Sequence, residues 1–137
     1  MIVRLVLLVA FCFPFVGCKK EGYQLPNAVE ISGSLSNDGE ILEVEGRMNG
    51  TGRVVMGFHP IIDGKPIEEV TQAWTDEDGS FKISQGIEPG EYLITVYQLE
   101  EEVDLLKGKF GPKKSKIIRT IDADTVLDID IANPEGE

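Results

Sequence analysis

Cysteine, histidine and tryptophan are nearly absent from this 137-residue sequence, which holds two, one and one of them. Both cysteines, Cys12 and Cys18, lie at the N-terminal end, so the rest of the chain can form no disulfide and no cysteine metal site. The one histidine, His59, has no second histidine or distant thiol with which to build a nucleophile–base pair. We therefore interpret His59, beside Pro60 in an apolar stretch, as structural. An enzyme is the least supported class of function, and no catalytic residue is assigned.

Long hydrophobic runs are also missing, with one exception at the N-terminus. Residues 5–16 are apolar apart from Pro14, and Arg4 precedes them. This run is shorter than the roughly 20 residues that a transmembrane helix needs. It has the layout of a signal-peptide core, and we predict a signal peptide over residues 1–17. The alternatives are a short uncleaved anchor and an ordinary secretory signal.

The end of this run carries a short motif. Phe15-Val16-Gly17-Cys18 resembles a lipobox, in which a small residue precedes the cysteine that receives the lipid. The resemblance implies a bacterial lipoprotein attached to a membrane through Cys18, with residues 18–27 as the lipidated cysteine and its tether. Lys19 follows the cysteine, where an Asp would signal inner-membrane retention in the usual diderm pattern. We therefore expect the cell envelope, and the outer membrane in a diderm cell.

The charge balance is strongly acidic, with a formal net charge of −11. Residues 1–17 carry only Arg4, so the remainder has 12 basic and 24 acidic residues and a net charge of 12 − 24 = −12. Such a chain is unsuited to nucleic acid. Half of those 12 cations nevertheless gather in one region, where they could bind an anionic partner such as lipid headgroups or polysaccharide. The alternative is a solvated loop that balances the acidic residues at 100–104. The six cations are Lys107, Lys109, Lys113, Lys114, Lys116 and Arg119.

Alternation of apolar and polar residues is the recurring pattern, and it predicts half-buried strands. We expect a long connection over residues 100–116, with a helical turn around residues 103–106 and Phe110 as a packing anchor. Seven or eight short strands with close turns and no long helical period predict an all-β fold, a single antiparallel β-sandwich over residues 28–132, followed by an acidic tail at 133–137. The expected strands cover residues 29–35, 42–48, 53–62, 68–74, 80–84, 92–99, 117–121 and 127–131.

Two turn motifs carry a further resemblance. Thr75-Asp76-Glu77-Asp78-Gly79-Ser80-Phe81, together with Glu88-Pro89-Gly90-Glu91-Tyr92, resembles the carboxypeptidase regulatory-like, transthyretin-like β-sandwich. In this pattern Asp78-Gly79 makes a tight hairpin turn, and Phe81 and Tyr92 fill the core. The resemblance extends to small bacterial lipoproteins, through Phe58-His59-Pro60 and the segment at residues 109–115. It implies an accessory, structural or binding module, and it leaves the order of the first strands open.

Two weaker candidates remain. Asp76 and Asp78, or Asp122 and Asp124, could hold a surface calcium ion, although Trp74 stands where an EF-hand would need a ligand. We expect turn chemistry instead, and we assign no metal or cofactor.

Trp74 and Tyr97 could form a carbohydrate-stacking surface. We expect a non-enzymatic, lipid-anchored envelope module for protein interaction or structural support, with a protein or envelope-polymer partner. The alternative is a small-ligand or glycan-binding module, with or without calcium.

Overall fold

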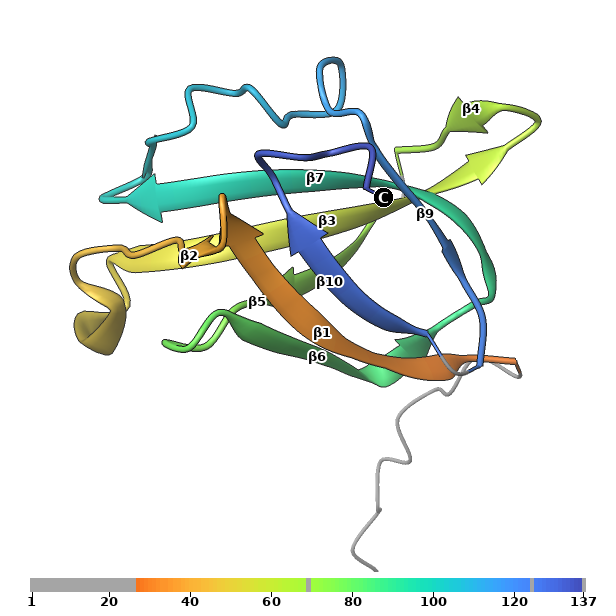
Figure 1. Cartoon of the computed structure of the whole chain (residues 1–137), viewed down its shortest axis with the longest axis horizontal. Coiled ribbons are helices and arrows are strands. Elements are labelled where there is room, and N and C mark those ends of the chain that lie inside the picture. The colour runs from red at the N-terminus through yellow and green to blue at the C-terminus, as the bar shows by residue number, and fades with distance from the viewer. Residues whose placement is uncertain (1–26, 69, 124, 137) are drawn as a thin grey trace, which may run out of the picture.

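The computed structural model describes residues 27–68, 70–123 and 125–136 (Figure 1). The predicted signal peptide, Cys18 and the tether up to residue 26 lie outside the described residues. Within them the chain forms strands and one 3₁₀ turn, so the predicted all-β fold is confirmed. No helix in these ranges has the length and apolar character to span a membrane. The elements are β1 (Val29–Asn37), β2 (Glu40–Ile41), η1 (Arg47–Asn49), β3 (Gly52–Ile62), β4 (Lys65–Pro66), β5 (Thr71–Trp74), β6 (Ser80–Ile87), β7 (Gly90–Glu100), β8 (Val103–Asp104), β9 (Ile117–Ile121) and β10 (Val126–Asp130).

The strands form two sheets that face each other (Figure 1). In the first sheet β1 is central, with β10 on one side and β6 and β2 on the other. In the second, β3 and β7 are central, β5 and β4 pair with β3, and β9 and β8 pair with β7. The β5–β6 hairpin passes from one sheet to the other, and Thr75 bridges to Phe81 at that corner. The result is a β-sandwich of seven longer strands and three strands of two residues.

One pairing departs from the predicted antiparallel arrangement. β10 runs parallel to β1, with Gly33 opposite Leu127 and Leu35 opposite Ile129. The chain leaves β9 at the end of the molecule where β1 begins, so β10 enters the sheet in the same direction as β1 (Figure 1). This pairing also settles the place of the first strand, which the sequence left open.

The core lies between the sheets and is built from alternate side chains, as the sequence predicts. Phe81 and Tyr92 are both buried, as expected from the turn motifs. The rings of Phe58 and Phe81 lie with centroids 6.2 Å apart and join the two sheets. The last strand buries Leu127 and Ile129, the alternation that the sequence shows most clearly.

The strand predicted over residues 42–48 is wrong. β2 ends at Ile41, and the chain then runs irregularly into η1. Leu42 still enters the core, but Gly46 adopts a left-handed backbone (φ 74°) and its carbonyl accepts hydrogen bonds from the N–H groups of Thr51 and Gly52. These hydrogen bonds close a local loop, so residues 42–48 do not form the backbone hydrogen-bond ladder of a paired strand. Met48 is left 97% exposed.

The Asp130 carboxylate joins the end of β10 to the β1–β2 turn. It accepts hydrogen bonds from the backbone N–H groups of Ala132 (2.9 Å), Asp38 (2.7 Å) and Gly39 (3.2 Å). These bonds stabilise the charged form, and they lower the pKa of Asp130 below its ordinary value of 3.8.

We therefore predict a pH-dependent contribution from Asp130 to folding. Because its pKa is lower in the folded chain, its contribution is present above pH 3.8 and is lost as the pH falls through the folded value. The urea concentration at the midpoint of unfolding is measured at about pH 6 and at about pH 3. We expect the difference between these two midpoints to be smaller for Asp130→Asn than for the unmodified chain. If Asp130→Asn leaves that difference unchanged or makes it wider, this prediction is contradicted.

Candidate functional site

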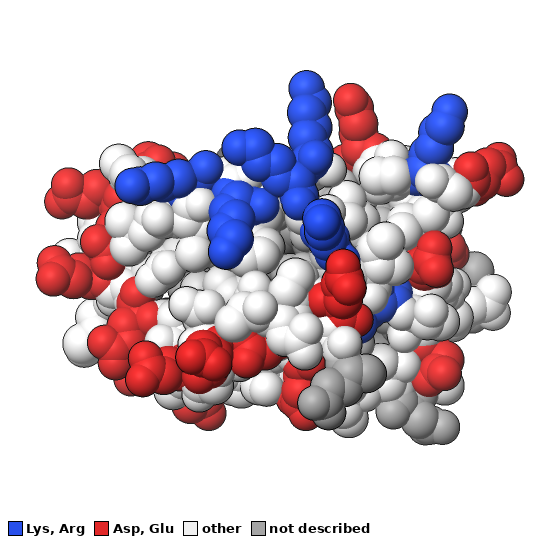
Figure 2. Space-filling model, turned by 45° about the horizontal axis from the view of Figure 1, so that its top comes forward, with Lys and Arg blue, Asp and Glu red and all other residues white. Residues whose placement is uncertain are grey.

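The predicted cations are carried mainly by residues 105–116, which we call the basic segment. It leaves β8, runs along the edge of β7 and enters β9 at Ile117, and it lies at the top of the molecule in Figure 1. Figure 2 shows Lys and Arg side chains gathered along the upper part of the molecule, with Asp and Glu side chains along the lower and left margins and others at the upper right, the right margin and the centre. The predicted helical turn around residues 103–106 is wrong, because the chain forms β8 and then a series of turns.

Asp104 braces the start of the basic segment. Its carboxylate accepts hydrogen bonds from the backbone N–H groups of Gln98 (3.1 Å), Leu106 (3.1 Å) and Gly108 (2.7 Å). The N–H of Leu105 also donates to the carbonyl of Gln98 at 2.7 Å. One side chain therefore holds the turn and the strand edge together, which is the reason that this stretch does not form a helical turn.

Phe110 and Ser115 brace the remainder. Phe110 is a packing anchor, as predicted, because its ring is buried in the core (4% exposed). Its carbonyl accepts a hydrogen bond from the N–H of Val96 (3.1 Å), and the Ser115 hydroxyl donates to the carbonyl of Ile94. The basic segment thus covers the part of the β7 edge that lies between β8 and β9, and its backbone is held in place.

The five lysines of the basic segment are exposed. Among the described residues, the two ion pairs join Arg53 to Glu102 and Lys82 to Glu30, so neither involves these lysines. Lys109 lies over the Phe110 ring, with 5.1 Å from Nζ to the centroid. The lysines of this set are Lys107, Lys109, Lys113, Lys114 and Lys116.

Three of the four acidic side chains at 100–104 are engaged elsewhere, all except that of Glu101. Glu100 accepts a hydrogen bond from the N–H of Glu45, Glu102 pairs with Arg53, and Asp104 binds backbone. The structure therefore gives no direct pairing for the alternative in which these carboxylates neutralise the lysines.

Arg119 differs from the five lysines. It lies on β9 between the buried residues Ile117 and Ile121, and it is only partly exposed. Its Nη1 donates to the carbonyls of Ile118 (2.8 Å) and Pro134 (3.1 Å). Its guanidinium thus holds the C-terminal tail against the sandwich.

The two candidate aromatics, Trp74 and Tyr97, lie on one face. Val55 on β3 pairs with Trp74 on β5 and with Tyr97 on β7, so the three residues form a row across the sheet. Their neighbours Val54 and Val96 point into the core, so the row faces outward. Trp74 is 56% exposed.

The row ends at the basic segment. A Cβ built on Gly111 would lie 3.6 Å from the Tyr97 hydroxyl oxygen, and the neighbouring Phe110 pairs with Val96. The fold thus brings the aromatic and basic candidates, which are far apart in sequence, to adjacent positions.

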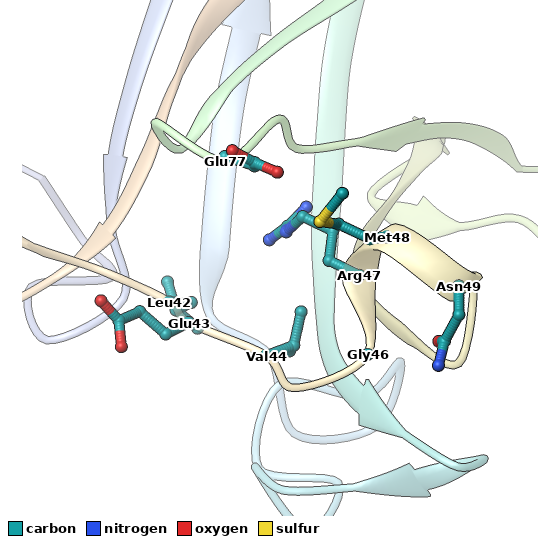
Figure 3. Close-up of a pocket in the computed structure, with 8 residues that line it drawn as sticks. All are labelled: Leu42, Glu43, Val44, Gly46, Arg47, Met48, Asn49 and Glu77. Atoms are coloured by element: carbon teal, nitrogen blue, oxygen red, sulfur yellow. The ribbon is translucent and has the colours of Figure 1, made fainter.

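A shallow pocket of about 460 Å³ lies between residues 42–49 and the β5–β6 turn (Figure 3). Leu42 and Val44 line its apolar side, and the Arg47 guanidinium points toward its centre, below Glu77. Arg47 Nη1 donates to the carbonyl of Thr75. The lining contains no hydroxyl, thiol or imidazole, so it offers no nucleophile–base pair.

The other candidates have structural contacts. His59 Nδ1 lies 3.2 Å from the carbonyl oxygen of Ile67, and its Nε2 lies 3.3 Å from the hydroxyl oxygen of Thr95. Both ring nitrogens of His59 therefore have partners within the fold, and its structural role stays an interpretation.

The acidic turns show turn chemistry. Asp78 accepts hydrogen bonds from the hydroxyl (2.6 Å) and the N–H (2.9 Å) of Ser80, and these bonds lower the pKa of Asp78. Asp122 accepts a hydrogen bond from the Thr125 hydroxyl, and Asp124 lies outside the described residues. Across the described ranges, no three His, Cys, Asp or Glu side chains gather in a group that could hold a metal ion.

Comparison of the chain with protein-family models, curated proteins and solved structures finds no match. The lipoprotein and transthyretin-like resemblances therefore stay predictions.

Proposed function

We propose that this chain is a non-enzymatic module of the bacterial cell envelope, held at a membrane by a lipid on Cys18, that binds an anionic envelope macromolecule through its basic segment. In a diderm cell we place it at the outer membrane. The observation that supports this most is the set of five exposed lysines, carried on a braced backbone and outside both ion pairs of the described residues.

Bracing favours binding on physical grounds. A flexible loop loses backbone entropy when it binds, whereas a segment fixed by Asp104, Phe110 and Ser115 loses less. The net negative charge of the chain repels a polyanion from most of its surface and favours an approach to the basic segment. Attraction of a polyanion requires only positive point charges, and the ammonium group of lysine supplies them.

Charge reversal tests the proposal. We expect the full chain, purified in detergent micelles, to bind polyphosphate, and Lys113→Glu/Lys114→Glu to weaken that binding at least about 25-fold. Each lysine near an anionic surface contributes roughly 1 kcal/mol, or a factor of about five. Biolayer interferometry with immobilised polyphosphate measures the affinities.

A charge-matched pair of single variants gives the control. Lys114→Glu changes the basic segment, whereas Lys65→Glu makes the same change in net charge on β4. We expect a clear loss for Lys114→Glu and little for Lys65→Glu. Equal losses would mean that net charge, and not the basic segment, determines binding.

A further inference from the structure

The outward-facing row Trp74–Val55–Tyr97 continues the basic segment across the second sheet. Register places Trp74 and Tyr97 two strands apart, at a separation of about 10 Å between their backbones. Val55 lies between them and gives the platform an apolar floor. A short run of sugar rings covers such a span.

The exposure of Trp74 is itself informative. A tryptophan that is more than half exposed leaves much apolar area in water, and Val70 nearby on the same face is exposed too. The Cγ2 atom of Val70 would lie 2.9 Å from a Cβ built on Gly57, so Val70 lies over the strand beside Val55. Val55 (8% exposed) and Thr95 (1%) are covered on this face, so its exposed apolar area lies at Trp74 and Val70, where a ligand can reach it from solvent.

The nature of the ligand follows from the two neighbouring surfaces. Aromatic faces stack against the C–H faces of pyranose rings, and lysines attract carboxylate or sulfate groups. Gly111 lies beside the Tyr97 hydroxyl, so a chain stacked on the row meets the basic segment directly. Such a surface matches a polymer of sugar rings that carries negative charge.

The position of the basic segment disfavours the headgroups of the anchoring bilayer. The described chain begins at the lower right in Figure 1, at the start of β1, and the basic segment lies along the top. The described chain therefore enters the domain on the side where β1 begins, and the basic segment lies away from that point, where a polymer can reach it.

We infer that the Trp74–Val55–Tyr97 row and the basic segment form one binding surface for an anionic polysaccharide. The inference rests on the proposed function and names the class of its partner. Sugar rings stack on Trp74 and Tyr97, and acidic groups of the polymer lie against the lysines.

Trp74 is the single tryptophan in the chain, so its fluorescence reports on the platform directly. Hyaluronan supplies charged sugar rings, and polyphosphate supplies charge without rings. We expect hyaluronan to change the Trp74 emission of the full chain in detergent micelles, and polyphosphate to bind without that change. We expect Trp74→Ala to weaken hyaluronan binding about fivefold to tenfold and to leave polyphosphate binding intact.

Val126→Ala is the matched control, because Val126 is an exposed apolar residue on the first sheet. It should keep the affinity for both polymers. If hyaluronan binds Trp74→Ala as well as the unmodified chain, or binds without a change in emission, the stacking platform is wrong, while polyphosphate binding would still support the proposed function. If neither polymer binds, both proposals are wrong.

Discussion

Replacing Phe110 by Ala is expected to lower the free energy of unfolding by about 3–5 kcal/mol, the range for truncation of a buried phenylalanine. Phe110 is the one residue of the basic segment that is both buried in the core and hydrogen-bonded through its carbonyl to β7. Its removal leaves a cavity and frees the basic segment from the strand edge. Urea unfolding followed by Trp74 fluorescence measures the loss.

The neighbouring residue provides the control. Lys109 contacts the Phe110 ring from the solvent side, and a cation–π contact at an exposed site contributes about 0.5–1 kcal/mol. Lys109→Ala should therefore cost about that amount. A loss below about 1 kcal/mol for Phe110→Ala would contradict the packing described for the basic segment.

Replacing Cys18 by Ala is expected to abolish lipid labelling and membrane association of the full chain in a bacterial host. The predicted anchor depends on acyl chains attached to this sulfur, and each buried CH₂ contributes about 0.8 kcal/mol to membrane binding. Metabolic labelling with palmitate and membrane fractionation measure the two effects. Cys12→Ala is the matched control, because it removes the other cysteine, which lies within the predicted signal peptide. Labelled, membrane-bound Cys18→Ala protein would refute the lipoprotein assignment.

The sequence predicted β6 and β10 well because burial on one face imposes alternation of apolar and polar residues. Leu127 and Ile129 show this, and so do Phe81 and Ile83 on β6. Two errors share a cause. At residues 42–48 and 103–106 the apolar spacing suggested a regular element, but specific hydrogen bonds determined the backbone. The Gly46 carbonyl closed the first loop, and the Asp104 carboxylate braced the second turn.

The candidate site was predictable only in part. The clustering of the lysines is visible in the sequence. The hydrogen bonds by which Asp104 fixes the backbone of the basic segment are not, because in the sequence Asp104 is one of several acidic residues at 100–104. The sequence offers Trp74 and Tyr97 as a pair of aromatic residues, but their common face depends on the register of β5 and β7 against β3. Register between strands that are distant in the sequence cannot be predicted from a local sequence pattern. The parallel β1–β10 pairing was missed for the same reason.

The salt dependence of polyphosphate binding tests the central claim most directly, which is that the basic segment is a binding surface. If the lysines contact the polyanion, the logarithm of the affinity falls linearly with the logarithm of the salt concentration, because bound counterions are released. We predict a clearly negative slope for the unmodified chain, and a slope smaller in magnitude by roughly one for each lysine reversed in Lys113→Glu/Lys114→Glu. A slope near zero, or one that this double variant leaves unchanged, would contradict the account.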